Sequence, residues 1–124
     1  MKTILVVDDK RVQLKTLRRG LRTKGYQVVE AISGKEALDH LIRDSKIDIV
    51  LTDYAMPEMN GIELLQKIRK HNKTIPVIIM TAYGDQGLVV EAMHHQCNGF
   101  IDKPFDMDEL LEEINNIPFF KITG

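Results

Sequence analysis

The chain has 124 residues, the length of a single domain, and its 44% of hydrophobic residues is ordinary for a globular core, which argues against disorder. Its formal net charge of −1 gives no electrostatic reason to expect direct binding of nucleic acid by this domain. The one cysteine, Cys97, excludes an internal disulfide and favours a reducing, cytoplasmic location, and we expect neither a signal peptide nor a membrane span.

Apolar runs alternate with amphipathic stretches five times, which predicts an α/β fold with a parallel sheet. The runs at 4–7, 47–52 and 77–80 are nearly continuous in apolar residues, as expected for central strands that helices cover on both faces. The run at 27–31 is more polar and is typical of an edge strand, and the run at 99–101 is the shortest. We therefore expect five strands, each followed by a helix.

Capping residues and glycines mark the ends of the expected helices. Gly25 lies just past the end of the first, and Ser33 with Glu36 predicts a capping box that opens the second. Asn60 precedes the third, and Asp106 caps the fifth. The apolar sides that we expect on the first three helices are Leu14, Leu17 and Leu21; Leu38, Leu41 and Ile42; and Ile62, Leu65 and Ile68. A short fourth helix after 84–87 carries Val89, Val90, Ala92 and Met93, and the fifth is expected to bury Met107, Leu110, Leu111 and Ile114.

Two segments invite other interpretations. A basic cluster on the first expected helix is interpreted as a solvated helix face rather than as a nucleic-acid patch. The tail 118–124, in which Pro118 should end the last helix, either folds back on the domain, begins a linker or is an added segment, and its aromatic pair Phe119-Phe120 does not decide among these. The basic cluster comprises Lys10, Arg11, Lys15, Arg18, Arg19, Arg22 and Lys24.

Four of the expected strands end in reactive side chains: Asp8 with Asp9, Asp53, Thr81 and Lys103. In an open parallel sheet, ligand chemistry gathers outside the carboxyl ends of the strands. Three carboxylates suit a hard cation such as Mg²⁺, whereas a hydroxyl and an ammonium suit a phosphoryl group. The pattern therefore predicts a single phosphoryl-transfer site at this edge of the sheet.

The candidate nucleophile of this site is Asp53, which would form an aspartyl phosphate by in-line attack on a phosphorus atom. Thr81 could bind a phosphoryl oxygen, and Lys103 could pair with the Asp53 carboxylate before the reaction and with the phosphoryl group after it. The Lys103-Pro104 bond is a candidate cis peptide.

Each of these residues also has a simpler interpretation. Asp8 or Asp9 could cap the following helix, and Asp53 could be a capping or loop aspartate. Thr81 could reflect strand propensity alone, and Lys103 could be a solvated lysine. Only their occurrence together favours the site.

Four segments carry a resemblance to a known family: Val6-Val7-Asp8-Asp9, the loop 53–61, the segment 80–84 and Lys103-Pro104-Phe105. In this order and at this spacing they resemble the receiver domains of response regulators in two-component and phosphorelay signalling, the CheY-like superfamily. The resemblance implies a doubly wound, flavodoxin-like (βα)5 fold with five parallel strands in the order 2-1-3-4-5. It also implies that 1–117 forms the receiver domain.

The resemblance assigns Asp53 as the phosphoacceptor and implies Mg²⁺ as the cofactor, with Mn²⁺ as a second candidate. Asp9 would be a direct metal ligand together with Asp53, and Asp8 would act largely through water. The backbone carbonyl of Ala55 would be the third protein ligand. The resemblance implies slow self-phosphorylation and self-dephosphorylation only, so that the domain is not an enzyme in the ordinary sense.

The resemblance also implies a conformational switch and its partners. Thr81 and Phe100 would reposition after phosphorylation and change the face formed by the fourth helix, fifth strand and fifth helix. Phe100 lacks the hydroxyl that a tyrosine would supply at this position. A histidine kinase or histidine phosphotransfer protein would donate the phosphoryl group, an unknown output partner would read the switch, and phosphorylation could drive dimerisation.

Two other functions are alternatives for a chain with this pattern. A small aspartyl-phosphate phosphatase would also use carboxylates, Mg²⁺, threonine and lysine, but usually carries a second acid where Ala55 stands. A flavodoxin-like nucleotide or flavin carrier would need a glycine-rich phosphate loop after the first strand, where Asp8, Asp9 and Lys10 stand instead.

Overall fold

Five strands and five helices alternate in a computed structural model that describes residues 1–82, 84 and 86–117. The tail 118–124 and Tyr83, which belongs to the segment 80–84, lie outside these ranges. The elements are β1 (Thr3–Val7), α1 (Arg11–Thr23), β2 (Gln27–Ala31), α2 (Gly34–Arg43), β3 (Ile49–Asp53), α3 (Gly61–His71), β4 (Val77–Thr81), α4 (Gln86–His94), β5 (Gly99–Asp102) and α5 (Met107–Asn115).

The strands form one parallel sheet in the order β2-β1-β3-β4-β5, which confirms the predicted fold class. The register aligns Val7 with Thr52, and Asp53 with Met80 on the next strand. Thr81 pairs in turn with Asp102. Because all strands run in the same direction, their carboxyl ends share one edge of the sheet.

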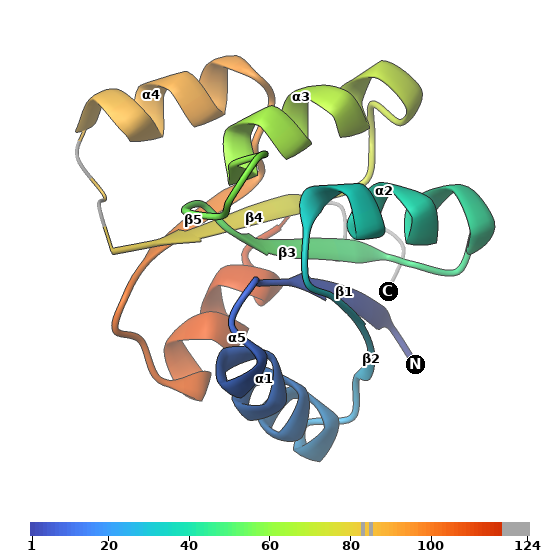
Figure 1. Ribbon diagram of the computed structural model, residues 1–124. Helices are drawn as coiled ribbons and strands as arrows, with labels where there is room; N and C mark the ends of the chain where they lie inside the picture. The colour runs from blue at the N-terminus through green and yellow to red at the C-terminus, as the bar shows by residue number, and fades with distance from the viewer. Residues whose placement is uncertain (83, 85, 118–124) are drawn as a thin grey trace.

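Helices cover both faces of the sheet: α2, α3 and α4 on one, α1 and α5 on the other (Figure 1). Successive side chains of a strand point to opposite faces, so Leu5 and Val7 join the core under α2, α3 and α4. Ile4 and Val6 join the core under α1 and α5. This double coverage explains why β1, β3 and β4 are buried along their whole length, whereas the edge strand β2 is mostly half-exposed.

Capping residues fix the starts of two helices as expected. Asp106 accepts a hydrogen bond from the Glu109 amide and Glu109 returns one to the Asp106 amide, which is a complete capping box for α5. Asn60 and Glu63 form the same arrangement at α3. At α1, Gly25 takes a φ of 94° just past the C-cap, a conformation that glycine adopts without steric cost.

The predicted capping box of α2 is only half right. The Ser33 hydroxyl accepts a hydrogen bond from the Glu36 amide at 3.1 Å. The Glu36 carboxylate, however, binds the Ile32 amide rather than the Ser33 amide. The long Glu36 side chain thus reaches one residue further back and holds the chain that enters the helix.

Two predicted details of the helices are wrong. Ile42, expected on the apolar side of the second helix, is 78% exposed. Val90 and Met93, which α4 carries, are also exposed. The helix α4 begins at Gln86, so Gly87 lies inside the helix rather than before it. Periodicity locates an apolar stripe, but it does not show how far the neighbouring elements extend over that stripe.

The solvated-face interpretation of the basic cluster on α1 agrees with the structure. Its members are exposed apart from Arg18, which is half-buried and forms an ion pair with Glu30 at 2.6 Å. None of the helices in the described ranges combines the length and the apolar character needed to traverse a lipid bilayer.

Candidate functional site

The carboxyl edge of the sheet brings together the side chains singled out in the sequence. Asp53 is the last residue of β3, Thr81 is the last of β4, and Asp8 and Lys103 directly follow β1 and β5. Asp8, Asp53 and Thr81 are almost completely buried, with exposed fractions of 0%, 3% and 1%. Polar side chains buried to this degree need partners, so the contacts among them indicate what the site can do.

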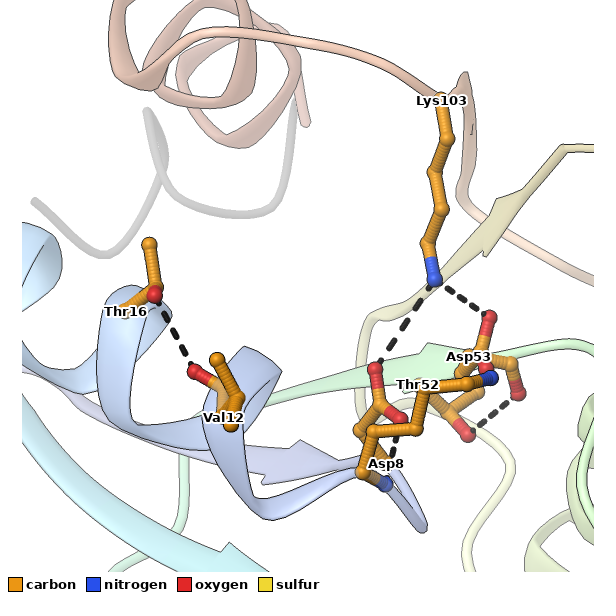
Figure 2. A network of polar contacts seen from close by, with 7 residues as sticks. Asp8, Val12, Thr16, Thr52, Asp53 and Lys103 are labelled. Atoms are coloured by element: carbon orange, nitrogen blue, oxygen red, sulfur yellow. Dashed lines mark hydrogen bonds and ion pairs between the residues drawn. The ribbon is translucent and has the colours of Figure 1, made fainter.

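Lys103 reaches into the middle of the site. Its ammonium donates a hydrogen bond to Asp53 Oδ1 at 2.9 Å and lies 3.8 Å from Asp8 Oδ2. Figure 2 shows the extended Lys103 side chain pointing at both carboxylates from the loop after β5. The Lys103 backbone is fixed by its amide, which donates to the Thr81 carbonyl at 2.8 Å, and the bond from Lys103 to Pro104 is cis.

Asp8 is an anion that the fold buries without full compensation. Its Oδ1 accepts a hydrogen bond from the Lys10 amide at 2.9 Å, while Oδ2 accepts none from the described part of the chain. Burial raises the pKa of Asp8, and the negative charges of Asp53 and Asp9 add to this, whereas the Lys10 amide and the Lys103 ammonium act in the opposite direction. The position therefore favours a bound cation.

The alternative in which Asp8 or Asp9 caps the following helix is wrong. The N-cap residue of α1 is Lys10, and no side chain forms a capping hydrogen bond there. The hydrogen bond from the Lys10 amide to Asp8 instead tightens the turn between β1 and α1 and fixes the direction of the Asp8 carboxylate.

Asp8, Asp9 and Asp53 fit a divalent cation. One oxygen from each carboxylate lies within 4.8 Å of the others. Asp8 Oδ2 and Asp9 Oδ1 are buried atoms that accept no hydrogen bond within the described ranges, so both keep lone pairs for a ligand. A set of carboxylate oxygens suits Mg²⁺ or Mn²⁺ better than softer metals. Ala55, whose carbonyl was assigned as a further ligand, is an exposed residue of the loop after β3.

Phe100 lies on β5, which pairs directly with β4, the strand that ends at Thr81. It is half-buried on β5 and packs against the core under α2, α3 and α4. The side chain of Thr81 belongs to the neighbouring strand β4, which pairs with β5 along its length. Thr81 and Phe100 therefore lie on adjacent, hydrogen-bonded strands.

Gly61 lies beside the site, although the sequence analysis named it only within the loop 53–61. A methyl group at Gly61 would lie 2.7 Å from the Asp53 carbonyl oxygen and 3.0 Å from the Tyr54 Cα. The Gly61 amide donates to the Tyr54 carbonyl at 2.8 Å. Glycine is therefore needed for the loop to return directly beside Asp53, and only the short spacing between the two residues in the sequence could have signalled this.

A model of the response regulator receiver domain matches residues 4–115 of the chain. The chain is 41% identical to the regulatory protein AtoC of Escherichia coli K12 over 107 residues, which cover 86% of the chain and 23% of AtoC. It is 36% identical to the chemotaxis protein CheY of Thermotoga maritima over 117 residues, which cover 94% of the chain and 97% of that protein. The chain thus spans under a quarter of AtoC but nearly all of this CheY.

Solved structures give the same picture. A response regulator receiver domain protein from Clostridium thermocellum superimposes with a TM-score of 0.92 at 32% identity, with 100% of both chains covered. A CheY-like receiver domain protein from Methanospirillum hungatei superimposes with a TM-score of 0.91 at 29% identity, with 100% and 99% covered. The carboxylates and the lysine thus lie on a fold shared over the whole length of the chain.

Proposed function

The chain belongs to the response regulator receiver domain family, and we propose from its site that it is a switch in which Asp53 accepts a phosphoryl group from a phosphohistidine. Receiver domains are signalling switches rather than classical enzymes. The observation that carries the assignment of Asp53 is the buried contact of its carboxylate with Lys103, at 2.9 Å, beside two further carboxylates. The donor would be a histidine kinase or a histidine phosphotransfer protein.

The transfer needs a nucleophile and an oriented donor. An Asp53 carboxylate oxygen forms a bond to phosphorus while the P–N bond of the phosphohistidine breaks. The electron pair of that bond stays on the imidazole, which takes up a proton from solvent. Lys103, which pairs with Asp53 before transfer, then neutralises charge on the phosphoryl oxygens.

Mg²⁺ would be held by Asp9 and Asp53, by Asp8 largely through water, and by the Ala55 carbonyl. A divalent cation supplies charge neutralisation between the carboxylates and the incoming phosphoryl oxygens. The chain provides the remaining conditions. Burial of Asp8 and Asp53 keeps the carboxylates in fixed positions, and the Gly61 turn holds the loop after Asp53 close to the strand end.

The signal would leave the site through Thr81 and Phe100. The Thr81 hydroxyl would bind a phosphoryl oxygen that exists only after transfer, and Phe100 would repack against the core that it already contacts. The face formed by α4, β5 and α5 would then change for an output partner or a second copy of the domain. Phosphorylation would thereby shift the population between two states of this face.

The assignment of Asp53 is tested by phosphorylation with acetyl phosphate or phosphoramidate in the presence of Mg²⁺. Intact-mass measurement should show one added phosphoryl group that hydroxylamine removes, and Asp53→Asn should show none. Asp39→Asn, which changes an exposed carboxylate on α2, is the matched control and should be modified like the parent. A hydroxylamine-labile phosphate on Asp53→Asn would place the acceptor elsewhere.

The phosphatase alternative makes a different prediction. Ala55 stands where a phosphatase would carry its proton donor, so we propose that the phosphoryl group is stored and lost slowly. A steady-state assay with phosphate esters should show at most slow, self-limited release of phosphate. Turnover at ordinary enzyme rates, about 1 s⁻¹ or more, would reject the switch.

A further inference from the structure

A cavity of about 500 Å³ opens between the C-terminal ends of α2 and α3, and we call it the α2–α3 cavity. It is also bordered by the loops that lead into β3 and β4, so it lies at the amino edge of the sheet, whereas Asp53 ends β3 at the carboxyl edge. Its volume falls within the usual range of small-molecule sites. The phosphoacceptor function does not use it.

Part of the lining of the α2–α3 cavity is apolar. Ile47, Ile68 and Ile75 are buried core residues that also line the cavity. The opposite wall is a stripe on α2 at helical positions i, i+3 and i+4, made of Leu38, Leu41 and Ile42.

From the sequence, these three residues were expected on the apolar side of the second helix. In the structure Leu38 and Leu41 are half-buried and Ile42 is 78% exposed. Alignment of the three side chains along one cavity wall makes them a continuous apolar surface rather than isolated exposed residues. An apolar helix stripe that remains exposed is expected where a surface binds a partner or ligand.

The mouth of the α2–α3 cavity carries more positive than negative charge. Lys67, Lys70 and His71 line it from α3, against one carboxylate, Asp44. Asp44 Oδ1 already accepts a hydrogen bond from the Lys46 amide. An anionic group at this mouth would therefore meet two ammonium groups and one carboxylate.

The C-terminal ends of α2 and α3 oppose an anion there, because helix C-termini carry partial negative charge. Arg69 donates hydrogen bonds to the carbonyls of Asn72 and Ile75, at 3.1 and 2.8 Å, and both carbonyls lie beyond the last residue of α3. The attraction for an anion at the mouth therefore comes from the side chains of Lys67 and Lys70.

We propose that the α2–α3 cavity binds a small amphiphilic anion, with an alkyl chain of about ten carbons on the apolar walls and a carboxylate or similar head at Lys67 and Lys70. The six apolar lining residues suit the alkyl chain, and the ammonium groups of Lys67 and Lys70 suit the anionic head. Because the cavity and Asp53 lie at opposite edges of the sheet, this binding is independent of the proposed phosphorylation.

The test is a titration of the ¹⁵N-labelled protein with decanoate below its micelle-forming concentration, followed by amide chemical shifts. Saturable shifts are expected at the C-terminal halves of α2 and α3 and in the loops that follow them. Decanoate should bind about tenfold more tightly than decanol, and decyltrimethylammonium should not saturate the same amides. Shifts that spread over the surface without saturation, or equal affinity for decanoate and decanol, would overturn the proposal.

Two variants locate the site. Ile42→Asp puts a carboxylate on the apolar wall and should weaken decanoate binding by about tenfold or more. Lys70→Glu should weaken binding of decanoate but not of decanol. Both residues are exposed, so both variants should fold, and Lys70→Glu decides the matter if Ile42→Asp does not. Val90→Asp changes an exposed apolar residue on α4 and is the control; loss of binding in all three variants, or in none, would reject the site.

Discussion

The ammonium of Lys103 lies 2.9 Å from Oδ1 of Asp53, a residue 50 positions earlier in the chain. Asp53 ends β3 and Lys103 follows β5, and β4 lies between these two strands in the sheet. The lysine therefore spans a neighbouring strand to place its charge among the carboxylates. Its ammonium lies close enough to the Asp8 and Asp53 carboxylates to compete with a metal ion for their negative charge.

Removal of this charge should affect metal binding and phosphorylation in opposite directions. Lys103→Met deletes a cation that competes for the Asp8 and Asp53 carboxylates. We expect the variant to bind Mg²⁺ about tenfold more tightly, because a nearby cation is worth on the order of 1 kcal/mol. Phosphorylation by acetyl phosphate should nevertheless be slower by about tenfold or more, since the phosphoryl oxygens lose their cation.

The control for this prediction is Lys103→Arg, which keeps the positive charge but changes its shape. Its Mg²⁺ affinity, measured by calorimetry, should stay close to that of the parent. If Lys103→Met binds Mg²⁺ more weakly than the parent, the lysine supports the carboxylates rather than competing for them.

Asp8→Asn should stabilise the metal-free fold at neutral pH. Burial raises the pKa of Asp8 above its ordinary value of 3.8, so the ionised carboxylate costs folding free energy at pH 7. Asparagine removes the charge and keeps an oxygen for the Lys10 amide. Urea unfolding in EDTA at pH 7 should show a gain on the order of 1 kcal/mol.

The pH dependence of this effect has a definite sign. A carboxyl whose pKa is raised in the folded state lowers stability fully above its folded pKa, and the loss disappears as the pH falls to the unfolded pKa. The advantage of Asp8→Asn should therefore shrink as the pH is lowered towards 3.8. Saturating Mg²⁺ should reverse the order of stability at pH 7, because ligand binding stabilises the parent more. An unchanged advantage at low pH would contradict the assignment to Asp8.

Gly61 and Gly25 should respond differently to the same substitution. Gly61→Ala brings a methyl group to 2.7 Å from the Asp53 carbonyl oxygen, so the loop must move. We expect a loss of about 1–3 kcal/mol in unfolding free energy and slower phosphorylation of Asp53. At Gly25, the methyl group of alanine would meet no atom within 4 Å, so only the φ of 94° disfavours the substitution. We expect Gly25→Ala to lower the free energy of unfolding by about 1 kcal/mol and to leave phosphorylation unchanged. Slower phosphorylation of Gly25→Ala would show that general destabilisation, rather than the loop, controls the rate.

Much of the fold could be predicted from the sequence, because the signals for it are local. Continuous apolar runs identify strands covered on both faces, and an aspartate three residues before a glutamate gave the complete cap at Asp106. The approach of Lys103 to Asp53 also followed, since parallel strands place their carboxyl ends at one edge.

Other features depend on distances between elements, which the sequence pattern does not contain. Ile42 belongs to an apolar stripe by spacing, yet α3 and the loops around it leave that stripe open to the α2–α3 cavity. Glu36 was paired with the wrong amide because the length of its side chain allows two targets one residue apart. Arg69 is one of three basic residues in the last turn of α3, and its hydrogen-bond partners come together only in the folded chain.

Arg69 is predicted to be the most important basic residue for stability among the described α3 residues. Its guanidinium donates to the carbonyls of Asn72, Ile75 and Gln96 and to the Asn98 side chain, at 2.8–3.2 Å. Lysine cannot reproduce this fork, so Arg69→Lys should lose about 2 kcal/mol of unfolding free energy by leaving carbonyl groups without a donor. Arg19→Lys on the exposed face of α1 should change the free energy of unfolding by less than about 0.5 kcal/mol. If Arg69→Lys and Arg19→Lys change the free energy of unfolding equally in urea denaturation, the carbonyls regain their hydrogen bonds from water. The contacts of Arg69 with the loop before β5 would then not stabilise the fold.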